Sequence, residues 1–253
     1  MNIKDKKVII TGGSGGIGSS ITEMLLLNGA IVCSIDKNEK SLGNLLTKNK
    51  SNSKNLRTFP IDVTDNKLII SAVNSFYEEF GEIDILINNS AILDDCLLVN
   101  IFGGKINKHP IERWNKTLQT NLTSYFMFTR EVVEKMLLKR TKGLVINISS
   151  ISSAGNFGQS SYSSSKAAVD SLTVTWANEL SNFGIRVAGI SPGMTDTPMP
   201  RNSMNSNQLN EWISKTPMNR MGQPSEIAHS VEYIISNDFF CGRTIQIDGG
   251  LRM

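Results

Sequence analysis

Histidine and cysteine are scarce in this sequence of 253 residues. It holds two histidines, His109 and His229, and three widely spaced cysteines, Cys33, Cys96 and Cys241. Neither histidine lies in an HExxH-type arrangement and no two cysteines form a CxxC pair, so the common metal-site patterns are absent. Isolated cysteines also argue against a secreted disulfide framework and favour a reducing, cytoplasmic compartment. We therefore expect no metal cofactor and no chemistry that depends on a histidine.

Long apolar runs and a strong charge of one sign are missing as well. No apolar stretch approaches the roughly 18 residues of a membrane span, and the run before Thr11 is too short for a signal-peptide core. The formal net charge is +3, and the lysines and arginines are scattered rather than gathered in a stripe. We expect a cytoplasmic protein that binds neither membranes nor nucleic acid.

The sequence does contain a repeated alternation of short β-branched runs and helical patterns. Runs that are apolar on both faces predict a parallel sheet covered by helices on both sides. No linker divides the chain, so we predict one α/β domain over residues 1–253, a doubly wound (Rossmann) sheet of about seven strands. Expected strands cover residues 8–10, 30–35, 56–61, 83–87, 144–148, 187–190 and 245–247; expected helices cover 17–27, 66–80, 111–138, 163–180 and 225–235; a surface loop is expected at 48–54.

A glycine-rich turn, residues 11–18, joins the first expected strand to the first expected helix. It reads Thr-Gly-Gly-Ser-Gly-Gly-Ile-Gly. Glycines let the backbone approach a pyrophosphate, whose charge then lies at the helix N-terminus. Asp36 ends the second strand 18 residues after Gly18, where a carboxylate accepts hydrogen bonds from an adenosine ribose. The arrangement predicts a dinucleotide site.

Asp36 also bears on which nicotinamide cofactor binds. A carboxylate at this position favours a free 2′-hydroxyl and repels the 2′-phosphate of NADP. Gly15 stands where a basic residue would help to hold that phosphate, whereas Lys37 offers a cation that would pair with it. We expect NAD(H), and NADP(H) stays open because of Lys37.

Tyr162 is the one tyrosine of four with a lysine, Lys166, four residues further on. This spacing places the phenol and the ammonium on one face of a helix. The pKa of a free phenol is about 10, and a nearby cation lowers it by favouring the phenolate. A tyrosine tuned in this way can act as a general acid or base. A surface pair on a helix is the alternative, so the interpretation depends on the surrounding motifs.

Those surrounding motifs carry a resemblance that covers the whole chain. The sequence resembles the short-chain dehydrogenase/reductase family, and within it the 3-oxoacyl-[acyl-carrier-protein] reductase-like and acetoacetyl-CoA reductase-like branch. The matching motifs are the TGxxxGxG turn from Thr11 to Gly18, Asp62-Val63, Asn88-Asn89-Ser90-Ala91, Asn121, Ser149-Ser150, Tyr162 with Lys166, and Pro192 to Thr197; those that point to the branch are Gly158-Gln159 and the ending from Asp238 to Arg252.

The resemblance implies hydride transfer between a nicotinamide and a carbonyl or secondary alcohol. Tyr162 would donate a proton to the carbonyl oxygen as hydride reaches the carbon, or take it back in oxidation. Lys166 would hold the nicotinamide ribose and lower the pKa of Tyr162. Ser150 would polarise the carbonyl, and Asn121 would organise a water that relays protons through Lys166.

The resemblance also implies a set of cofactor-binding residues. Asp62 and Val63 would contact the adenine, and residues 192–197 would meet the nicotinamide carboxamide. The expected set is Gly12, Ser14, Gly16, Ile17, Gly18, Asp36, Asp62, Val63, Asn89, Ser90, Ala91, Tyr162, Lys166, Pro192, Gly193, Thr195 and Thr197.

Two features depart from the usual family pattern. Ala91 replaces a glycine near the cofactor, and its methyl group either loosens binding or fills a gap. Ser149 and Ser150 compete for the catalytic position, because the common spacing of 13 residues before the tyrosine fits Ser149. The strand-end motif of the resembled branch fits Ser150. We choose Ser150 and leave Ser149 as the alternative.

Three further expectations concern the surroundings of the site. Residues 194–218, with four methionines, are expected to form a lid over the substrate, since methionine packs adaptably. Residues 100–108 contain Gly103-Gly104 and suggest a turn, either a short hairpin or a substrate-facing flap. Surplus apolar residues on the helices with Asn121 and after Tyr162 suggest contacts between subunits, and the resemblance implies a homotetramer.

The favoured function is reduction of a 3-oxoacyl thioester, carried by acyl carrier protein or CoA, to the 3-hydroxyacyl form. One alternative keeps the chemistry but changes the substrate to a sugar, polyol or other secondary alcohol. Another is a catalytically idle dinucleotide-binding sensor or assembly subunit, against which the intact set of Asn121, Ser150, Tyr162 and Lys166 argues.

Overall fold

Seven parallel strands form the central sheet of the computed structural model, which describes residues 1–252. The spatial order is β3-β2-β1-β4-β7-β8-β9, and every neighbouring pair is parallel. The predicted seven-stranded doubly wound sheet is confirmed. The strands are β1 (Lys7–Thr11), β2 (Ile31–Asp36), β3 (Leu56–Pro60), β4 (Ile85–Asn88), β7 (Leu144–Ile148), β8 (Arg186–Pro192) and β9 (Thr244–Ile247).

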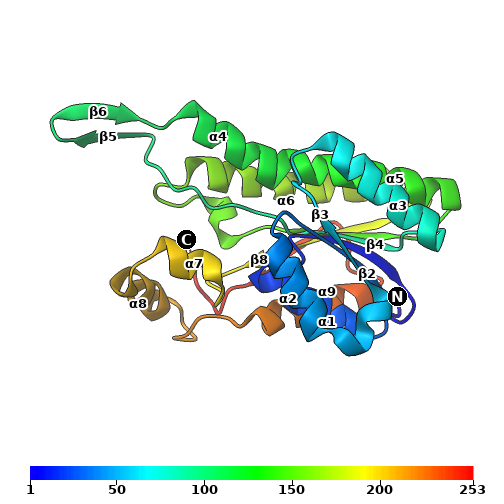
Figure 1. The fold of residues 1–253 in the computed structure, drawn as a ribbon. Coiled ribbons are helices and arrows are strands. Elements are labelled where there is room, and N and C mark those ends of the chain that lie inside the picture. The colour runs from blue at the N-terminus through cyan, green and yellow to red at the C-terminus, as the bar shows by residue number, and fades with distance from the viewer. Residues whose placement is uncertain (253) are drawn as a thin grey trace.

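Helices cover both faces of this sheet (Figure 1). Val8 and Ile10 point into the core beneath α1 (Gly16–Leu27) and α9 (Pro224–Ser236). Ile9, between them, points into the opposite core. That second core lies against α3 (Asn66–Phe80), α5 (Ser124–Lys139) and α6 (Ser160–Leu180). Side chains of successive strand residues alternate between faces, so strands apolar on both faces need both helical layers.

The direction of the strand order reverses between β1 and β4. In a doubly wound sheet, the connections leaving the carboxyl ends of two such strands diverge and open a crevice where ligands bind. The Thr11 hydroxyl oxygen bridges the two strand ends here, accepting hydrogen bonds from the backbone N–H groups of Asn89 at 3.0 Å and Ser90 at 3.1 Å. The loop after β4 is therefore fixed beside the glycine-rich turn.

The predicted helix over residues 111–138 is interrupted by a wider turn. It consists of α4 (Ile111–Leu118), a π-helical turn (Gln119–Thr123) and α5. A π turn adds a residue to the helical repeat and is frequent at functional sites. It carries Asn121, whose side chain is fully buried.

Other elements differ from the sequence prediction. A helix α2 (Glu39–Lys48) was not expected, and residues 50–55 form a 3₁₀ helix, so the predicted loop over 48–54 is wrong. The Asn49 side chain donates to the Leu45 carbonyl at 2.9 Å and ends α2, and the chain then continues in a tighter turn.

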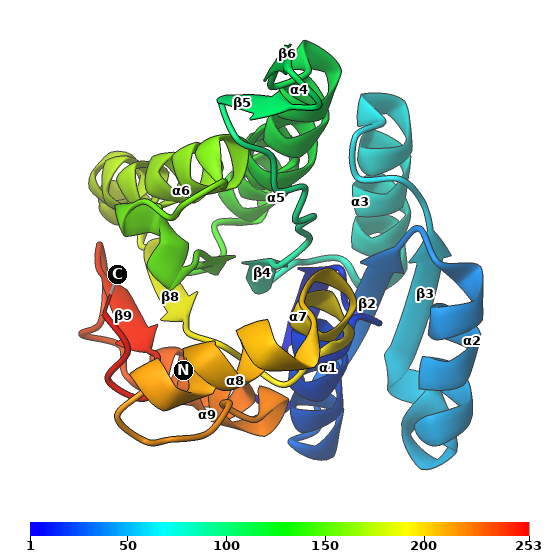
Figure 2. The same cartoon turned by 90° about the vertical axis from the view of Figure 1, so that its left-hand side faces the viewer.

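The segments around the predicted site have structure of their own. Strands β5 (Val99–Phe102) and β6 (Lys105–Lys108) form an antiparallel hairpin around Gly103 and Gly104, which confirms the hairpin reading. Figure 1 shows this hairpin projecting beyond α4. The expected lid holds α7 (Pro198–Ser203) and α8 (Ser206–Lys215), which lie in front of α1 and α9 in Figure 2. Within residues 1–252, no helix is long and apolar enough to cross a membrane.

Candidate active site

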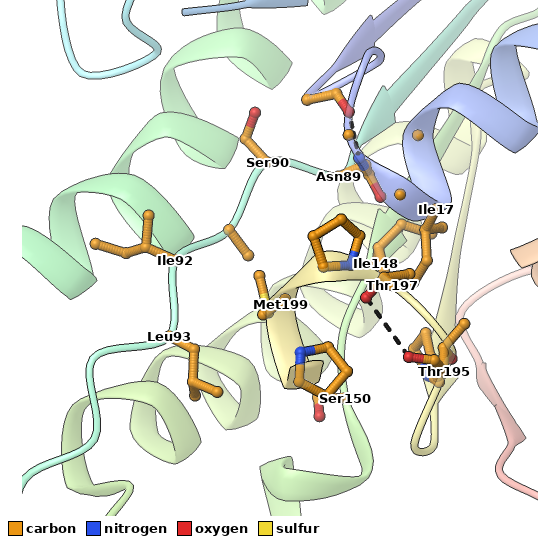
Figure 3. A pocket seen from close by; sticks show the side chains of 18 of the residues that line it. Ile17, Asn89, Ser90, Ile92, Leu93, Ile148, Ser150, Thr195, Thr197 and Met199 are labelled. Carbon is orange, nitrogen blue, oxygen red and sulfur yellow. Dashed lines mark hydrogen bonds between the residues drawn. The ribbon is translucent and has the colours of Figure 1, made fainter. Parts of the chain in front are cut away.

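A cavity of about 520 Å³ lies at the carboxyl ends of β1, β4, β7 and β8. Every residue that the sequence predicted for the cofactor lines it, together with Ser149 and Ser150. In Figure 3, Ile92 and Leu93 lie across the cavity from Thr195 and Thr197, with Met199 between them. Lining residues that the sequence did not predict individually include Asn38, Ser41, Ile92, Leu93, Thr120, Ile148, Ile151, Ser152, Asn156 and Trp212.

The glycine-rich turn presents bare backbone to this cavity. Gly15 precedes α1, and no side chain caps the first N–H groups of that helix. A Cβ on Gly18 would overlap the Gly12 carbonyl oxygen, and one on Gly16 would lie 2.5 Å from Cγ2 of Thr197. The turn therefore brings uncapped N–H groups close to the cavity, which fits the pyrophosphate of a dinucleotide.

Asp36 is held at the rim of the cavity by two neighbours. Ser14 Oγ donates to one carboxylate oxygen at 2.7 Å, and the backbone N–H of Asn38 donates to the other at 3.1 Å. Each carboxylate oxygen has two acceptor sites, so both retain capacity for a ribose hydroxyl. Lys37 also lines the cavity, so both features that bear on the cofactor face the same space.

Ser150 and Ser149 point in different directions at the end of β7. The Ser150 side chain acts on Tyr162 and opposes the effect of burial on the pKa of that phenol, while its Oγ accepts a hydrogen bond from the Ser152 N–H at 3.1 Å. The Ser149 hydroxyl instead donates to the backbone carbonyl of Lys166 at 3.3 Å, away from the phenol. Of the two serines, Ser150 is therefore the one whose hydroxyl is beside the candidate acid.

Lys166 lies at the floor of the cavity, but its ammonium is directed elsewhere than expected. Its Nζ donates to the Ile148 carbonyl at 2.7 Å and to the Tyr125 hydroxyl at 3.2 Å, and lies 5.9 Å from the ring centre of Tyr162. Burial lowers the pKa of Lys166 to about 7. Burial also raises the pKa of Tyr162. The expected lowering by Lys166 is not found: burial raises the pKa of Tyr162, Ser150 opposes this, and the charge of Asp95 adds to the rise.

Asn121 does not line the cavity. Its Oδ1 accepts a hydrogen bond from the Ile92 N–H at 2.8 Å, and its Nδ2 donates to the Ile92 carbonyl at 2.9 Å. The side chain thus fixes the loop after β4, which contributes Ile92 and Leu93 to the cavity wall. Both ends of the amide bind the Ile92 backbone and the side chain lies outside the cavity lining, so the contact with a relay water stays a prediction.

Comparison with known proteins agrees with this architecture. The family model described as short chain dehydrogenase matches residues 6–208. The 3-oxoacyl-[acyl-carrier-protein] reductase FabG of Thermotoga maritima is 33% identical over 254 residues, covering 99% of each chain. The proteins of the same name from Vibrio cholerae and Escherichia coli are 32% and 33% identical over 256 residues, covering 100% of each chain.

A solved structure gives the same result for the fold. The crystal structure of gox2181 superposes with a TM-score of 0.88 at 27% sequence identity, covering 98% of this chain and 96% of that one. The family match, the full-length relatives and the sheet order all agree. The chain therefore belongs to the short-chain dehydrogenase family and is an NAD(P)-dependent oxidoreductase.

Proposed function

We propose that this protein reduces a 3-oxoacyl thioester, carried by acyl carrier protein or CoA, to the 3-hydroxyacyl form. The observation that carries the proposal is that Ser150, Tyr162 and Lys166 line one cavity together with the uncapped turn that precedes α1. The substrate class is supported by full-length similarity to proteins named 3-oxoacyl-[acyl-carrier-protein] reductase.

In this mechanism Tyr162 is the proton donor. Its pKa is raised by burial, so the phenol keeps its proton at neutral pH and can give it to a carbonyl oxygen during reduction. Ser150 donates a hydrogen bond to the same oxygen and polarises the carbonyl. When the nicotinamide cofactor is bound, it supplies the hydride. Lys166 would hold the nicotinamide ribose through its remaining N–H and would stabilise the phenolate left on Tyr162.

We propose NAD(H) rather than NADP(H) as the cofactor. Asp36 accepts hydrogen bonds from Ser14 and from the Asn38 backbone, which hold its carboxylate at the rim with acceptor sites to spare. A 2′-phosphate there would meet that negative charge, whereas a 2′-hydroxyl would donate to it. Lys37 lines the same cavity and would attract a 2′-phosphate. It therefore weakens the preference for NAD(H), but the negative charge of Asp36 remains.

The test compares the wild-type protein with Tyr162→Phe. Oxidation of NADH and NADPH is followed with acetoacetyl-CoA and with a 3-oxoacyl thioester of acyl carrier protein. Loss of the phenol should lower kcat about 1,000-fold, since general acid catalysis contributes roughly 100- to 10,000-fold. Tyr233→Phe, on helix α9 and outside the cavity, removes a hydroxyl that accepts a hydrogen bond from Asn237 at 2.8 Å, and this variant should retain activity.

Two outcomes would contradict different parts of the proposal. Undiminished turnover in Tyr162→Phe would remove the proton donor from the mechanism. If the wild-type protein turned over polyols or other secondary alcohols but no acyl thioester, the mechanism would stand. The proposed substrate class would be wrong.

We also propose that the protein is a cytoplasmic homotetramer with contacts through α5 and α6. Phe126 on α5 and Val174 on α6 are 48% and 42% exposed, which leaves apolar surface on both helices available to another copy. Light scattering coupled to size-exclusion chromatography measures the mass; a monomer at micromolar concentration would rule this assembly out.

A further inference from the structure

Tyr125 is a buried tyrosine for which the proposed mechanism has no task. It lies on α5, is 1% exposed, and donates its hydroxyl proton to the Ile148 carbonyl at 3.1 Å. The same hydroxyl oxygen accepts a hydrogen bond from Nζ of Lys166 at 3.2 Å. A single backbone partner would already satisfy a buried phenol, so the bond to Lys166 calls for a separate explanation.

The Tyr125 hydroxyl and the Ile148 carbonyl are the hydrogen-bond partners of the Lys166 ammonium. Nζ donates to the Ile148 carbonyl at 2.7 Å and to the Tyr125 hydroxyl at 3.2 Å, and it lies 5.1 Å from the centre of the Tyr125 ring. An ammonium has three N–H donors. The Tyr125 hydroxyl and the Ile148 carbonyl take two of them and leave one for the cavity.

We propose that Tyr125 is a positioning residue that holds the ammonium of Lys166 at the cavity floor with one N–H directed to the nicotinamide ribose. The task of the lysine rests on the proposed function. The part played by Tyr125 rests on its own contact: its hydroxyl accepts the hydrogen bond from Nζ, and both side chains are only 1% exposed, so this bond is shielded from water.

Lys166 changes between its charged and neutral forms near neutral pH, so a contact that shifts its pKa slightly changes how much of it is charged. Burial brings the pKa of Lys166 down to about 7, and the negative charge of Asp170 opposes this. A hydrogen-bond acceptor favours the charged form of the lysine. Burial raises the pKa of Tyr125 well above its usual value, so the phenol stays neutral and remains an acceptor through its oxygen.

The titratable groups facing Lys166 come from two helices. Tyr125 lies on α5, whereas Tyr162 and Asp170 lie on α6, and Asp170 accepts a hydrogen bond from the Thr244 hydroxyl of β9 at 3.1 Å. Asp95, in the loop after β4, acts on Tyr162 and raises its pKa. Of these groups, Tyr125 is the one whose side chain forms a hydrogen bond with the Lys166 nitrogen.

The informative substitution is Tyr125→Phe, which keeps the ring and removes the hydroxyl. Without that acceptor, Lys166 is protonated less readily, and less positive charge remains beside Tyr162. The phenolate is then less stable, so the rising limb of kcat for alcohol oxidation should move to higher pH by about half a unit. Tyr125→Leu, which also removes the ring, should move it further.

A second measurement reads Lys166 directly and needs no turnover. The protein is labelled competitively with acetic anhydride between pH 5 and pH 11, and acetylation of Lys166 is quantified by mass spectrometry. The wild-type midpoint should lie near pH 7, and that of Tyr125→Phe about half a unit lower. The control is Tyr77→Phe, because Tyr77 carries Lys135 Nζ at 5.8 Å from its ring but lies outside the cavity.

Two results would overturn the proposal. They are a labelling midpoint that does not change in folded Tyr125→Phe, and a kinetic limb that stays in place or moves to lower pH. If Tyr125→Phe does not fold, Tyr125→Leu is measured and judged in the same way. If the wild-type protein turns over no substrate, the proposed function fails, while the labelling still decides the part played by Tyr125.

Discussion

The two walls of the cavity are built from different material. The wall at the glycine-rich turn is backbone, and Asn89 secures it by donating from Nδ2 to the carbonyls of Thr11 at 3.0 Å and Gly12 at 3.1 Å. The wall at the expected lid, residues 194–218, consists of side chains on and between α7 and α8 that include Met199, Met204 and Trp212. No residue of α8 is buried, whereas α1 buries half of its length against the core.

This difference explains which part of the ligand the chain specifies most narrowly. Backbone groups recognise what every dinucleotide shares, and they tolerate few side chains because a Cβ collides with neighbouring backbone. Flexible side chains on half-exposed helices adapt to a range of shapes, as methionine does in other binding surfaces. We expect substitutions in the backbone wall to cause large losses of cofactor binding. Substitutions in the side-chain wall should cause small, graded changes in the KM for the acyl substrate.

The largest effect is expected from Gly18→Ala in the backbone wall. The new Cβ would overlap the Gly12 carbonyl oxygen and lie 2.8 Å from Asn89 Nδ2, so α1 must shift away from the turn. Overpacking of this kind costs about 3 kcal/mol, and displacement of the uncapped N–H groups should raise the Kd for NADH about 100-fold. Urea unfolding and fluorescence titration with NADH measure the two quantities.

Gly43→Ala is the matched control for that substitution. Gly43 lies within α2, and a Cβ placed there meets nothing within 4 Å. The same change should therefore stabilise the helix by about 0.5 to 1 kcal/mol and leave the Kd for NADH unchanged. If Gly18→Ala and Gly43→Ala bound NADH with the same Kd, the backbone wall would tolerate an added Cβ, and the proposed difference between the two walls would be wrong.

An intermediate effect is expected from Asp36→Ala, at the edge of the same wall. The change removes the acceptor for a ribose 2′-hydroxyl and the charge that repels a 2′-phosphate, while Lys37 remains. A hydrogen bond to a charged group contributes about 1.5 to 3 kcal/mol, so the ratio of kcat/KM for NADH over NADPH should fall at least about tenfold.

Glu39→Gln controls for the lost negative charge, because Glu39 lies in the first turn of α2 and does not line the cavity. Its NADH preference should match that of the wild-type protein. A wild-type protein that already prefers NADPH would show that Lys37, and not Asp36, decides the cofactor.

The backbone-made wall is also the part of the site that the sequence predicts best. Strand β7 was predicted with both of its ends, residues 144 and 148, because a fully buried parallel strand must be apolar on both faces. The turn at 11–18 was recognisable because a backbone-made site demands glycine at fixed positions. Every expected cofactor residue consequently lines the cavity.

Contacts between distant parts of the chain were beyond such reasoning. Tyr125 and Lys166 are 41 residues apart, and nothing in local spacing indicates that their side chains meet. The π turn that buries Asn121 breaks the helical period by one residue, which a hydrophobic pattern cannot resolve. Helix α2 was missed because it buries only Leu42 and Leu45 and contains Gly43, so its apolar stripe is weak.

The smallest effect is expected from Trp212→Ala in the side-chain wall. Trp212 lines the cavity from α8, and Lys215 Nζ lies 5.4 Å from its ring, so the indole is held at the rim rather than in a core. Truncating a half-exposed aromatic contact costs about 1 kcal/mol, which predicts a rise of about fivefold in KM for the acyl substrate. The Kd for NADH should not change, because the backbone wall is untouched.

The control for Trp212→Ala is Phe239→Ala, which truncates an aromatic side chain that is 99% exposed and outside the cavity. Steady-state kinetics with substrates of increasing acyl length then measure the second wall directly. A lid that closes over the substrate should give a KM penalty that grows with acyl length, since each added methylene loses apolar contact with the indole. If the rise in KM were the same at every acyl length, Trp212 would contact only the part that all acyl substrates share. Residues 194–218 would then not enclose the acyl chain of the substrate.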